Sequence, residues 1–124
     1  MVQLERIPLS AIRKAAVYVN SGKKTLREIV AEQQPDIALT AAFYDPGPWK
    51  PVCPVKADGK VLFADPTYYY WAIAWDSGPD VREVLVPPGG SSARANYVAN
   101  CLLVREGKPQ PTLYYGADAG GRRG

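Results

Sequence analysis

The sequence predicts an α+β fold, in which a mixed, mostly antiparallel sheet with one or two short helices forms a single domain over residues 1–124. Three observations predict it. A helical signal lies at residues 25–33, and an Asp-Gly hairpin signal lies at 58–59. Runs of β-branched and aromatic residues, separated by Pro- and Gly-rich breakers, fill most of the remaining chain. A length of 124 residues is typical of one domain.

The first third of the chain predicts a strand, a helix and a second strand. Residues 15–20 (AAVYVN) predict the first strand. Thr25 followed by Glu28 has the spacing of a capping box, and apolar residues then recur on one helical face, so we expect a helix at 26–33. This order suggests a crossover unit leading to residues 37–44, with a mixed sheet equally open.

The stretch 36–65 organises the rest of the chain. Its apolar run 37–44, bounded by prolines, predicts a strand buried on both faces. The segment 46–54 cannot be a central strand because its prolines lack the N–H donor that a sheet needs. Asp58-Gly59 between β-prone residues predicts a hairpin over 55–64.

The remaining elements follow from aromatic and aliphatic runs between breakers. Alternation along the strand expected at 68–75 predicts that Tyr68 and Tyr70 lie outside the core, and one of Tyr114 and Tyr115 is expected outside it as well. The expected elements are strands at 68–75, 81–86, 100–106 and 112–115, and a short helix at 93–99.

Composition excludes several functions. The chain has no histidine, which rules out Ser-His-Asp and Cys-His catalysis, and its two separated cysteines do not form a zinc motif. We therefore expect no metal and no cofactor. A net charge of +3 without a dense Lys/Arg stripe disfavours a long nucleic acid as partner. No apolar run approaches a membrane span and no signal-peptide core is present, so we expect a cytoplasmic protein without membrane contact, in which Cys53 and Cys101 are reduced, buried hydrophobes.

Two segments are candidate anion sites. The helix start at 21–27 carries Lys23, Lys24 and Arg27 beside free backbone N–H groups, and the alternative is ordinary capping with solvated lysines. The segment 89–96 offers consecutive glycines, two serines and Arg94, and the alternative is a flexible connector.

Other residue types supply further candidates. Exposed tyrosines beside cations suit stacking on a base, or burial in a subunit interface. The terminal Arg122 and Arg123 add positive charge, and Asp45 and Asp118 in glycine-rich contexts form a candidate acid/base pair.

Three segments carry a resemblance to a known family: ALTAAFYDP at 38–46, the hairpin VKADGKV, and NCLLVREGKPQ. Over residues 15–124 the chain resembles the N-terminal half of the phosphodiester glycosidase family, whose corresponding strand–loop reads Asn-Gly-Gly-Phe-Phe-Asp. Thr40 and Ala41-Ala42 depart from that pattern. The chain also ends before the Arg-Thr-Ala and Asp-Gly-Gly-Gly segments that hold much of that family's active site. The resemblance implies a half-domain that binds a sugar-phosphate-like group without cleaving it.

By size and ligand logic the chain is also similar, more distantly, to the small oligomeric phage sponge proteins that counter Thoeris defence. Those proteins sequester cyclic ADP-ribose isomers, and some also hold cyclic di- or trinucleotides. This resemblance implies a homo-oligomer in the cytoplasm of the host cell.

These observations lead to one main expectation, a non-catalytic oligomeric binder that sequesters a small phosphorylated or cyclic nucleotide. Phosphates would lie near the cations, bases would stack on tyrosines, and an Asn amide would read a base edge. The expected ligand-binding residues are Lys24, Arg27, Tyr44, Arg94, Asn96, Tyr115, Arg122 and Arg123. The alternatives are a phosphodiester glycosidase, or a piece of one, using Asp45 or Asp118, and a structural protein such as a virion component.

Overall fold

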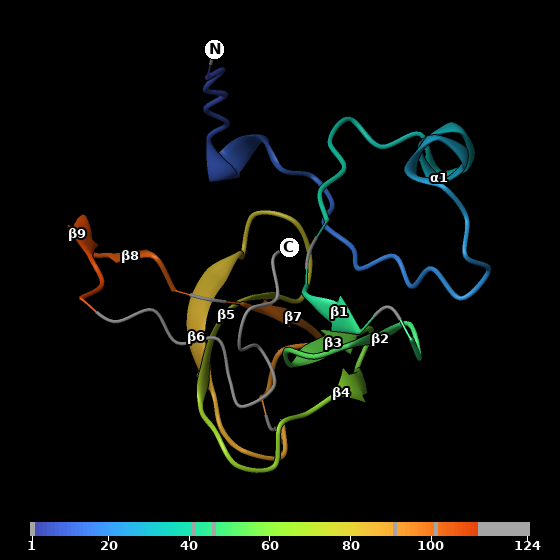
Figure 1. The fold of residues 1–124 in the computed structure, drawn as a ribbon. Helices are drawn as coiled ribbons and strands as arrows, with labels where there is room; N and C mark the ends of the chain where they lie inside the picture. Colours follow the sequence, from blue (N-terminus) through green and yellow to red (C-terminus); the bar gives the residue numbers. More distant parts are fainter. Residues whose placement is uncertain (1, 41, 46, 91, 101, 112–124) are drawn as a thin grey trace.

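A computed structural model describes residues 2–40, 42–45, 47–90, 92–100 and 102–111 (Figure 1). Its centre is a five-stranded sheet in the order β4-β3-β7-β5-β6, and every pairing in it is antiparallel. Its strands are β3 (Val55–Ala57), β4 (Lys60–Phe63), β5 (Tyr70–Trp75), β6 (Arg82–Val86) and β7 (Asn96–Ala99).

Smaller elements flank this sheet. The hairpins are β1 (Tyr44–Asp45) with β2 (Lys50–Pro51), and β8 (Val104–Arg105) with β9 (Lys108–Pro109). The helices are a 3₁₀ turn, η1 (Leu9–Ala11), and the helix α1 (Leu26–Gln33). The arrangement confirms the predicted α+β class with a mostly antiparallel sheet.

The helix α1 begins and ends where the sequence predicts. The Thr25 hydroxyl accepts a hydrogen bond from the Glu28 N–H at 3.3 Å, and the Glu28 carboxylate accepts one from the Thr25 N–H at 2.7 Å. This reciprocal pair confirms the capping box and satisfies two N–H groups that the first turn cannot pair internally. Gln34 then turns into the left-handed region at φ 48° and ends the helix before Pro35.

The hairpin β3–β4 is also confirmed. Asp58 and Gly59 both have positive φ, 47° and 81°, as the two central residues of a type I′ turn require. Asn96 at the start of β7 fixes this turn, because its side-chain oxygen accepts a hydrogen bond from the Asp58 N–H at 2.9 Å. The turn is thereby tied to the central strand.

One face of the sheet forms the core. Small and large side chains alternate across it, with Ala72, Ala74 and Ala99 beside Tyr70 and Tyr97. The Tyr97 hydroxyl donates to the Gly90 carbonyl at 2.8 Å, which satisfies its polar atom inside the core. The prediction that Tyr70 lies outside the core is wrong, because its ring fills this layer and its hydroxyl is hydrogen-bonded there, while Tyr68 is exposed as expected.

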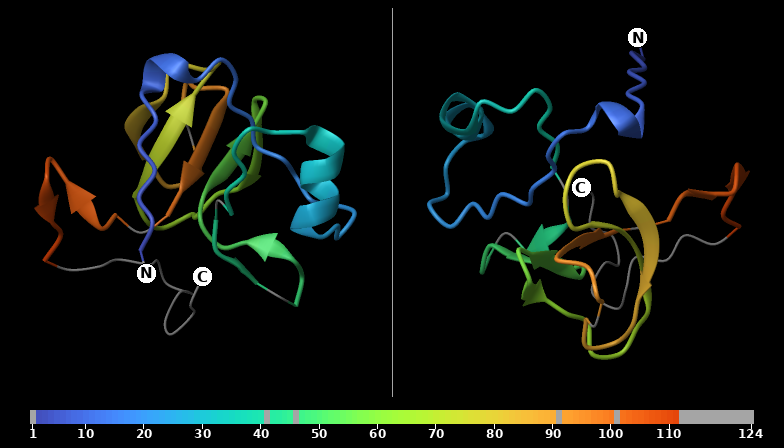
Figure 2. Two further views of the ribbon diagram at one scale, coloured as in Figure 1. Left: turned by 90° about the horizontal axis from the view of Figure 1, so that it is seen from above. Right: turned by 180° about the vertical axis from the view of Figure 1, so that it is seen from behind.

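Residues 12–15 lie against one end of the sheet. The Trp75 indole N–H donates to the Ala15 carbonyl at 2.9 Å. A Cβ at Gly78 would stand 2.5 Å from the Arg13 carbonyl oxygen, so only glycine admits this approach. The helix α1 lies to one side of the sheet and contains no buried residue (Figures 1 and 2).

Several predicted elements are wrong. Residues 15–20 form no strand, since no described strand lies beside them. Of the described residues in the run 37–44, only Tyr44 belongs to a strand, where it pairs with Pro51 of β2. The doubly buried strand and the crossover unit are therefore absent from the described residues, and residues 37–40 are exposed.

The C-terminal predictions have mixed outcomes. The helix predicted at 93–99 is wrong, since Asn96–Ala99 is the central strand β7. Among the described residues of the strand predicted at 100–106, only Val104–Arg105 forms a strand. Cys53 is buried as predicted, whereas Cys101 and the strand expected at 112–115 lie outside the described residues.

Candidate functional site

A stacked aromatic pair with a neighbouring cation forms the first candidate site. The rings of Tyr44 and Trp49 lie with centroids 5.5 Å apart and planes 12° apart. The ammonium group of Lys23 lies over the Trp49 ring, 5.8 Å from its centroid. Tyr44 is 54% exposed and Trp49 is 56% exposed, so the pair presents flat aromatic surface to solvent beside a positive charge. We call these three residues the aromatic–cation site.

The β1–β2 hairpin positions the two rings. Its strands pair Tyr44 with Pro51 and Asp45 with Lys50. The Asp45 carboxylate accepts a hydrogen bond from the Gly47 N–H at 3.0 Å, which holds the start of the connecting loop. Trp49 at the end of the loop has φ 56°, in the left-handed region that non-glycine residues rarely adopt.

The cation comes from a second constrained loop, just before α1. Lys23 also has positive φ, 52°. The Asn20 side chain bonds Lys24 twice: its oxygen accepts from the Lys24 N–H at 2.8 Å, and its amide donates to the Lys24 carbonyl at 2.7 Å. The Lys23–Trp49 contact thus joins two left-handed residues, and each such conformation costs about 1–3 kcal/mol.

Further positive charge lies close to Lys23 in the sequence. Lys24 forms an ion pair with Glu32 at 2.5 Å, and this hydrogen bond raises the pKa of the Lys24 ammonium. Arg27 lies in the first turn of α1 and forms no ion pair with any described residue. The structure therefore brings one of the predicted helix-start cations, Lys23, to the ring that stacks on the predicted Tyr44.

The other predicted site residues either lie at one end of the sheet or are not among the residues that the structure describes. Arg94 lies between the carboxylates of Asp76 and Asp80, with N–O distances of 2.9 and 3.3 Å. The pKa of the Asp80 carboxyl is lowered, mainly by the hydrogen bond that it accepts from the Asp76 N–H. The positive charge of Arg94 also lowers it. Asn96 is buried and bonds the Asp58 N–H and the Trp75 carbonyl. Tyr115, Asp118, Arg122 and Arg123 lie outside the described residues.

The glycine pair at 89–90 does not form the expected open anion nest. Gly89 and Gly90 both have positive φ, but their N–H groups donate to the carbonyls of Asp65 and Pro87 at 2.8 and 3.0 Å. These donors serve the fold. Whether Arg94 and Asn96 also bind a ligand stays a prediction.

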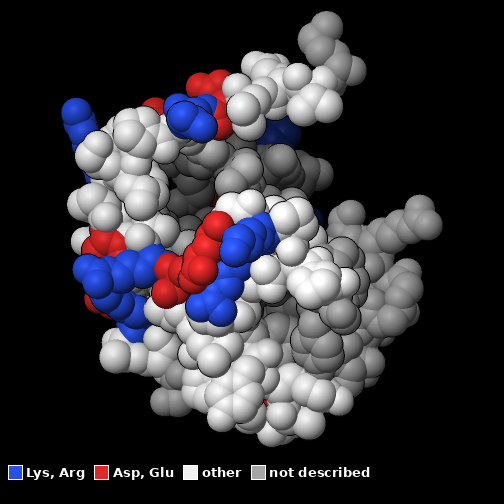
Figure 3. All heavy atoms as spheres, turned by 90° about the vertical axis from the view of Figure 1, so that its left-hand side faces the viewer, with Lys and Arg blue, Asp and Glu red and all other residues white. Residues whose placement is uncertain are grey.

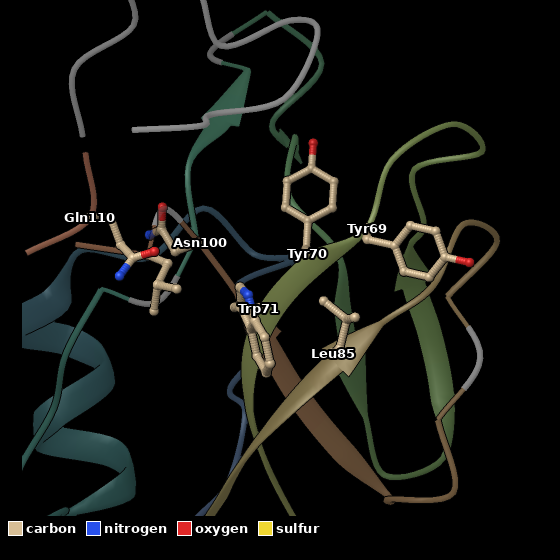
Figure 4. A pocket seen from close by; sticks show the side chains of 7 residues that line it. Tyr69, Tyr70, Trp71, Leu85, Asn100 and Gln110 are labelled. Carbon is tan, nitrogen blue, oxygen red and sulfur yellow. The ribbon is translucent and has the colours of Figure 1, made fainter. Parts of the chain in front are cut away.

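A pocket of about 230 Å³ forms the second candidate site, and the sequence did not point to it. It lies between the outer face of β5 and β6 and the segments on either side of the β8–β9 hairpin (Figure 4). The sequence signal that touches this pocket is the aromatic run at 68–71, which, from the sequence alone, predicts a strand. The pocket is lined by Tyr69, Tyr70, Trp71, Leu85, Asn100, Leu102 and Gln110.

The charge distribution and the positions of possible metal ligands bear on which ligands the described residues can bind. On the face shown in Figure 3, Lys and Arg side chains lie beside Asp and Glu side chains, and no single sign dominates. Within the described residues, no group of three or more His, Cys, Asp or Glu side chains is placed to hold a metal ion. The same residues contain no helix long and apolar enough to cross a membrane.

No protein-family model, curated protein or solved structure matches this chain.

Proposed function

We propose that the protein is a non-catalytic binder of a small nucleotide, which it holds at the aromatic–cation site. The observation that carries the proposal is the exposed Tyr44–Trp49 stack with the Lys23 ammonium beside it. An exposed aromatic ring stacks on any nucleobase, and an adjacent cation pairs with phosphate. Lys24 and Arg27 would then provide further positive charge for the phosphate groups.

The size of the ligand follows from the charge distribution. A long nucleic acid needs a continuous row of cations to follow its backbone, whereas this chain has a net charge of +3 and mixed signs on the face in Figure 3. A ligand with one or two phosphates requires only a few cations, such as Lys23 beside Trp49 and its sequence neighbours Lys24 and Arg27. A cyclic ADP-ribose isomer or a small cyclic oligonucleotide has this composition.

Sequestration would require slow release, which an exposed site does not provide by itself. Both rings are more than half exposed in the single chain, so a second subunit closing over them would exclude water and lengthen the residence time. We therefore propose a homo-oligomer that holds the nucleotide between subunits in the cytoplasm. If the chain is phage-encoded, this would be the cytoplasm of the host, and the role would be anti-defence sequestration.

A phosphodiester glycosidase is the second candidate function. The observation that favours it is Asp45, whose carboxylate lies in the same hairpin as Tyr44, so a sugar stacked on the aromatic pair would have an acid or base close by. In this case the ligand would be returned cleaved.

The test combines binding with recovery of the ligand. Native mass spectrometry and calorimetry with cyclic ADP-ribose isomers and cyclic dinucleotides would give affinity and subunit count, and chromatography after heat release would show whether the ligand is intact. We expect Trp49→Ala to weaken binding about tenfold or more, since stacking contributes about 1–3 kcal/mol per base. Lys23→Ala should weaken it less and reduce its salt dependence.

Matched variants control for non-specific effects. Tyr68→Ala removes an exposed aromatic ring outside the site, and Lys60→Ala removes an exposed lysine of β4, so both should bind like the parent protein. Unchanged affinity in both Trp49→Ala and Lys23→Ala would remove the aromatic–cation site from consideration. Intact ligand supports the binder, cleaved ligand supports the glycosidase, and no binding leaves a structural role.

A further inference from the structure

We propose that the pocket beside Trp71 is a separate binding site for a single uncharged ring that has a flat apolar face and a hydrogen-bonding edge. A pyranose sugar and the base of a nucleoside both have this chemistry. The proposal is independent of the nucleotide site at Trp49, and it depends on the walls, size and neutrality of the pocket.

The first wall is aromatic and aliphatic. Along β5, Tyr70 and Ala72 point into the core, so Trp71 points to the opposite face. The sheet register places Leu85 of β6 directly opposite Trp71, and Figure 4 shows the two side chains next to each other. Tyr69, 60% exposed, extends this wall at the start of the strand. A ring with an apolar face can pack against this wall.

The facing wall carries carboxamides. Asn100 and Gln110 lie together on the other side of the pocket from Leu85 (Figure 4). The Gln110 carboxamide offers a donor and an acceptor in one plane, which matches a pair of neighbouring hydroxyls or the edge of a base. The Gln110 amide donates only a long 3.4 Å bond to the Lys108 carbonyl, and its side-chain oxygen accepts no hydrogen bond from the described residues.

Arg105 holds the two walls together. Its guanidinium lies over the Trp71 ring, 4.1 Å from the centroid, and its Nε lies 3.7 Å from a carboxylate oxygen of Glu83 on β6. The Gln110 N–H donates to the Leu103 carbonyl at 2.9 Å and closes the base of the β8–β9 hairpin. The hairpin is thus fastened to the sheet, and the carboxamide wall stays opposite the aromatic wall.

Size and charge identify the class of ligand. A volume of about 230 Å³ is below the roughly 300 Å³ at which pockets begin to hold drug-sized ligands, so it accommodates one ring and not a cyclic dinucleotide. None of the lining side chains is charged, and Arg105, whose guanidinium lies over the Trp71 ring, already has its Nε 3.7 and 3.9 Å from carboxylate oxygens of Glu83 and Glu106. Phosphate would lose its hydration there without an unpaired counter-charge, so an uncharged ring is favoured.

A small ligand is also favoured over a peptide strand. β6 is the edge of the sheet next to the pocket, and an exposed edge can pair with an added strand. However, β6 begins with the charged pair Arg82-Glu83, and Pro87-Pro88 follow it directly. Charges and prolines at an edge oppose strand addition.

The three tryptophans provide the test, because each reports a different place. Trp71 lines the pocket, Trp49 belongs to the aromatic–cation site, and the Trp75 indole is bonded to Ala15. Proton–nitrogen NMR spectra of the ¹⁵N-labelled protein resolve one indole signal for each, assigned with Trp→Phe variants. One titration uses methyl pyranosides and a second uses uncharged nucleosides.

We expect one of these two ligand classes to shift the Trp71 signal while the Trp75 signal stays in place. A nucleoside that stacks at the aromatic–cation site would also move the Trp49 signal, so the Trp71 shift is the one that reports the pocket. The class that does so identifies the ring as a sugar or a base. Gln110→Ala should weaken this binding about fivefold through the lost hydrogen bonds. Gln33→Ala, at the exposed end of α1, should leave it unchanged.

Two results would overturn the proposal. One is that neither ligand class moves the Trp71 signal at millimolar concentration. The other is that Gln110→Ala, with a spectrum that shows an intact fold, binds as tightly as the parent protein. A shift confined to Trp49 would count against the pocket without affecting the nucleotide site.

Discussion

The Tyr70 hydroxyl donates a hydrogen bond to Oδ2 of Asp65 at 2.9 Å inside the core. The other carboxylate oxygen of Asp65 accepts the N–H groups of Thr67 and Tyr68 at 2.7 and 3.0 Å. Asp65 is only 9% exposed, so these bonds replace most of its hydration. The pair fastens the turn between β4 and β5 to the core.

Tyr70→Phe should lower the free energy of unfolding by about 1.5–3 kcal/mol, because a hydrogen bond to a buried carboxylate is lost while the ring remains. Urea denaturation followed by tryptophan fluorescence measures the change. Tyr69→Phe removes the same hydroxyl from the adjacent, exposed ring and should change stability little. Equal effects of the two variants would mean that the Asp65–Tyr70 bond contributes no stability.

The glycines at 89 and 90 offer a second matched comparison. Both have positive φ, so alanine at either position should cost about 1–2 kcal/mol of backbone strain. A Cβ at Gly90 would also lie 2.8 Å from both the Ala64 Cβ and the Tyr97 hydroxyl, whereas one at Gly89 would meet nothing within 4 Å. Gly90→Ala should therefore cost a further 1–3 kcal/mol or so by overpacking.

Thermal unfolding of Gly89→Ala and Gly90→Ala under the same conditions measures this difference. The expectation is a markedly lower midpoint for Gly90→Ala. If the two variants unfold together, the close packing of Gly90 against Tyr97 does not limit stability.

The elements that could be predicted from the sequence are those held by local contacts. The capping box joins Thr25 to Glu28 three residues away, and the hairpin turn needs only Asp58 and Gly59 in the left-handed region. In each case the residues that give the sequence signal are the same residues whose contacts or backbone conformations form the element. The helix boundaries and the β3–β4 hairpin were therefore correct.

The failures concern contacts between distant segments. Residues 15–20 have the composition of a strand, but no strand of the described chain lies beside them. Asn96–Ala99 became the central strand because β3 and β5 pair with it on both sides. The Lys23–Trp49 contact depends on the left-handed backbone conformation of both residues. Neither Lys nor Trp is a residue type that predicts this conformation. The sequence thus pointed to Tyr44 and to the helix-start cations separately and could not join them.

The absence of buried residues in α1 leads to a third prediction. Thr25→Ala should shift the helix–coil equilibrium of α1 about fivefold, or about 1 kcal/mol. It should leave the global free energy of unfolding unchanged, because the helix contributes nothing to the core. Cα chemical shifts of residues 26–33 report the first quantity and urea denaturation the second. Thr40→Ala, an exposed threonine outside the helix, is the control.

Acid should have the same local effect as Thr25→Ala. Hydrogen bonds from the backbone and side chain of Thr25 lower the pKa of Glu28, so its carboxylate stabilises the helix above its ordinary pKa. This contribution is lost as the pH falls through the lowered pKa. If the global free energy of unfolding of Thr25→Ala fell by as much as the stability of the helix, α1 would unfold together with the sheet.

Tyr97 should make the protein less stable in alkali. Burial raises the pKa of its hydroxyl above the ordinary tyrosine value of about 10. Above that pH the unfolded chain releases the Tyr97 proton, whereas the folded chain keeps it, so the unfolded state binds fewer protons. The free energy of unfolding then falls as the pH rises, until the folded-state pKa is reached.

Tyr97→Phe tests this source of alkaline sensitivity. The variant loses the bond to the Gly90 carbonyl and should be less stable than the parent at neutral pH, but its stability should decline less steeply above pH 10 or so. Tyr69→Phe, whose hydroxyl is exposed, should keep the slope of the parent protein. Urea denaturation at a series of pH values from neutral to alkaline gives both slopes. An unchanged slope in Tyr97→Phe would place the alkaline sensitivity on another titrating group, since only a proton held differently by the folded and unfolded chains can produce it.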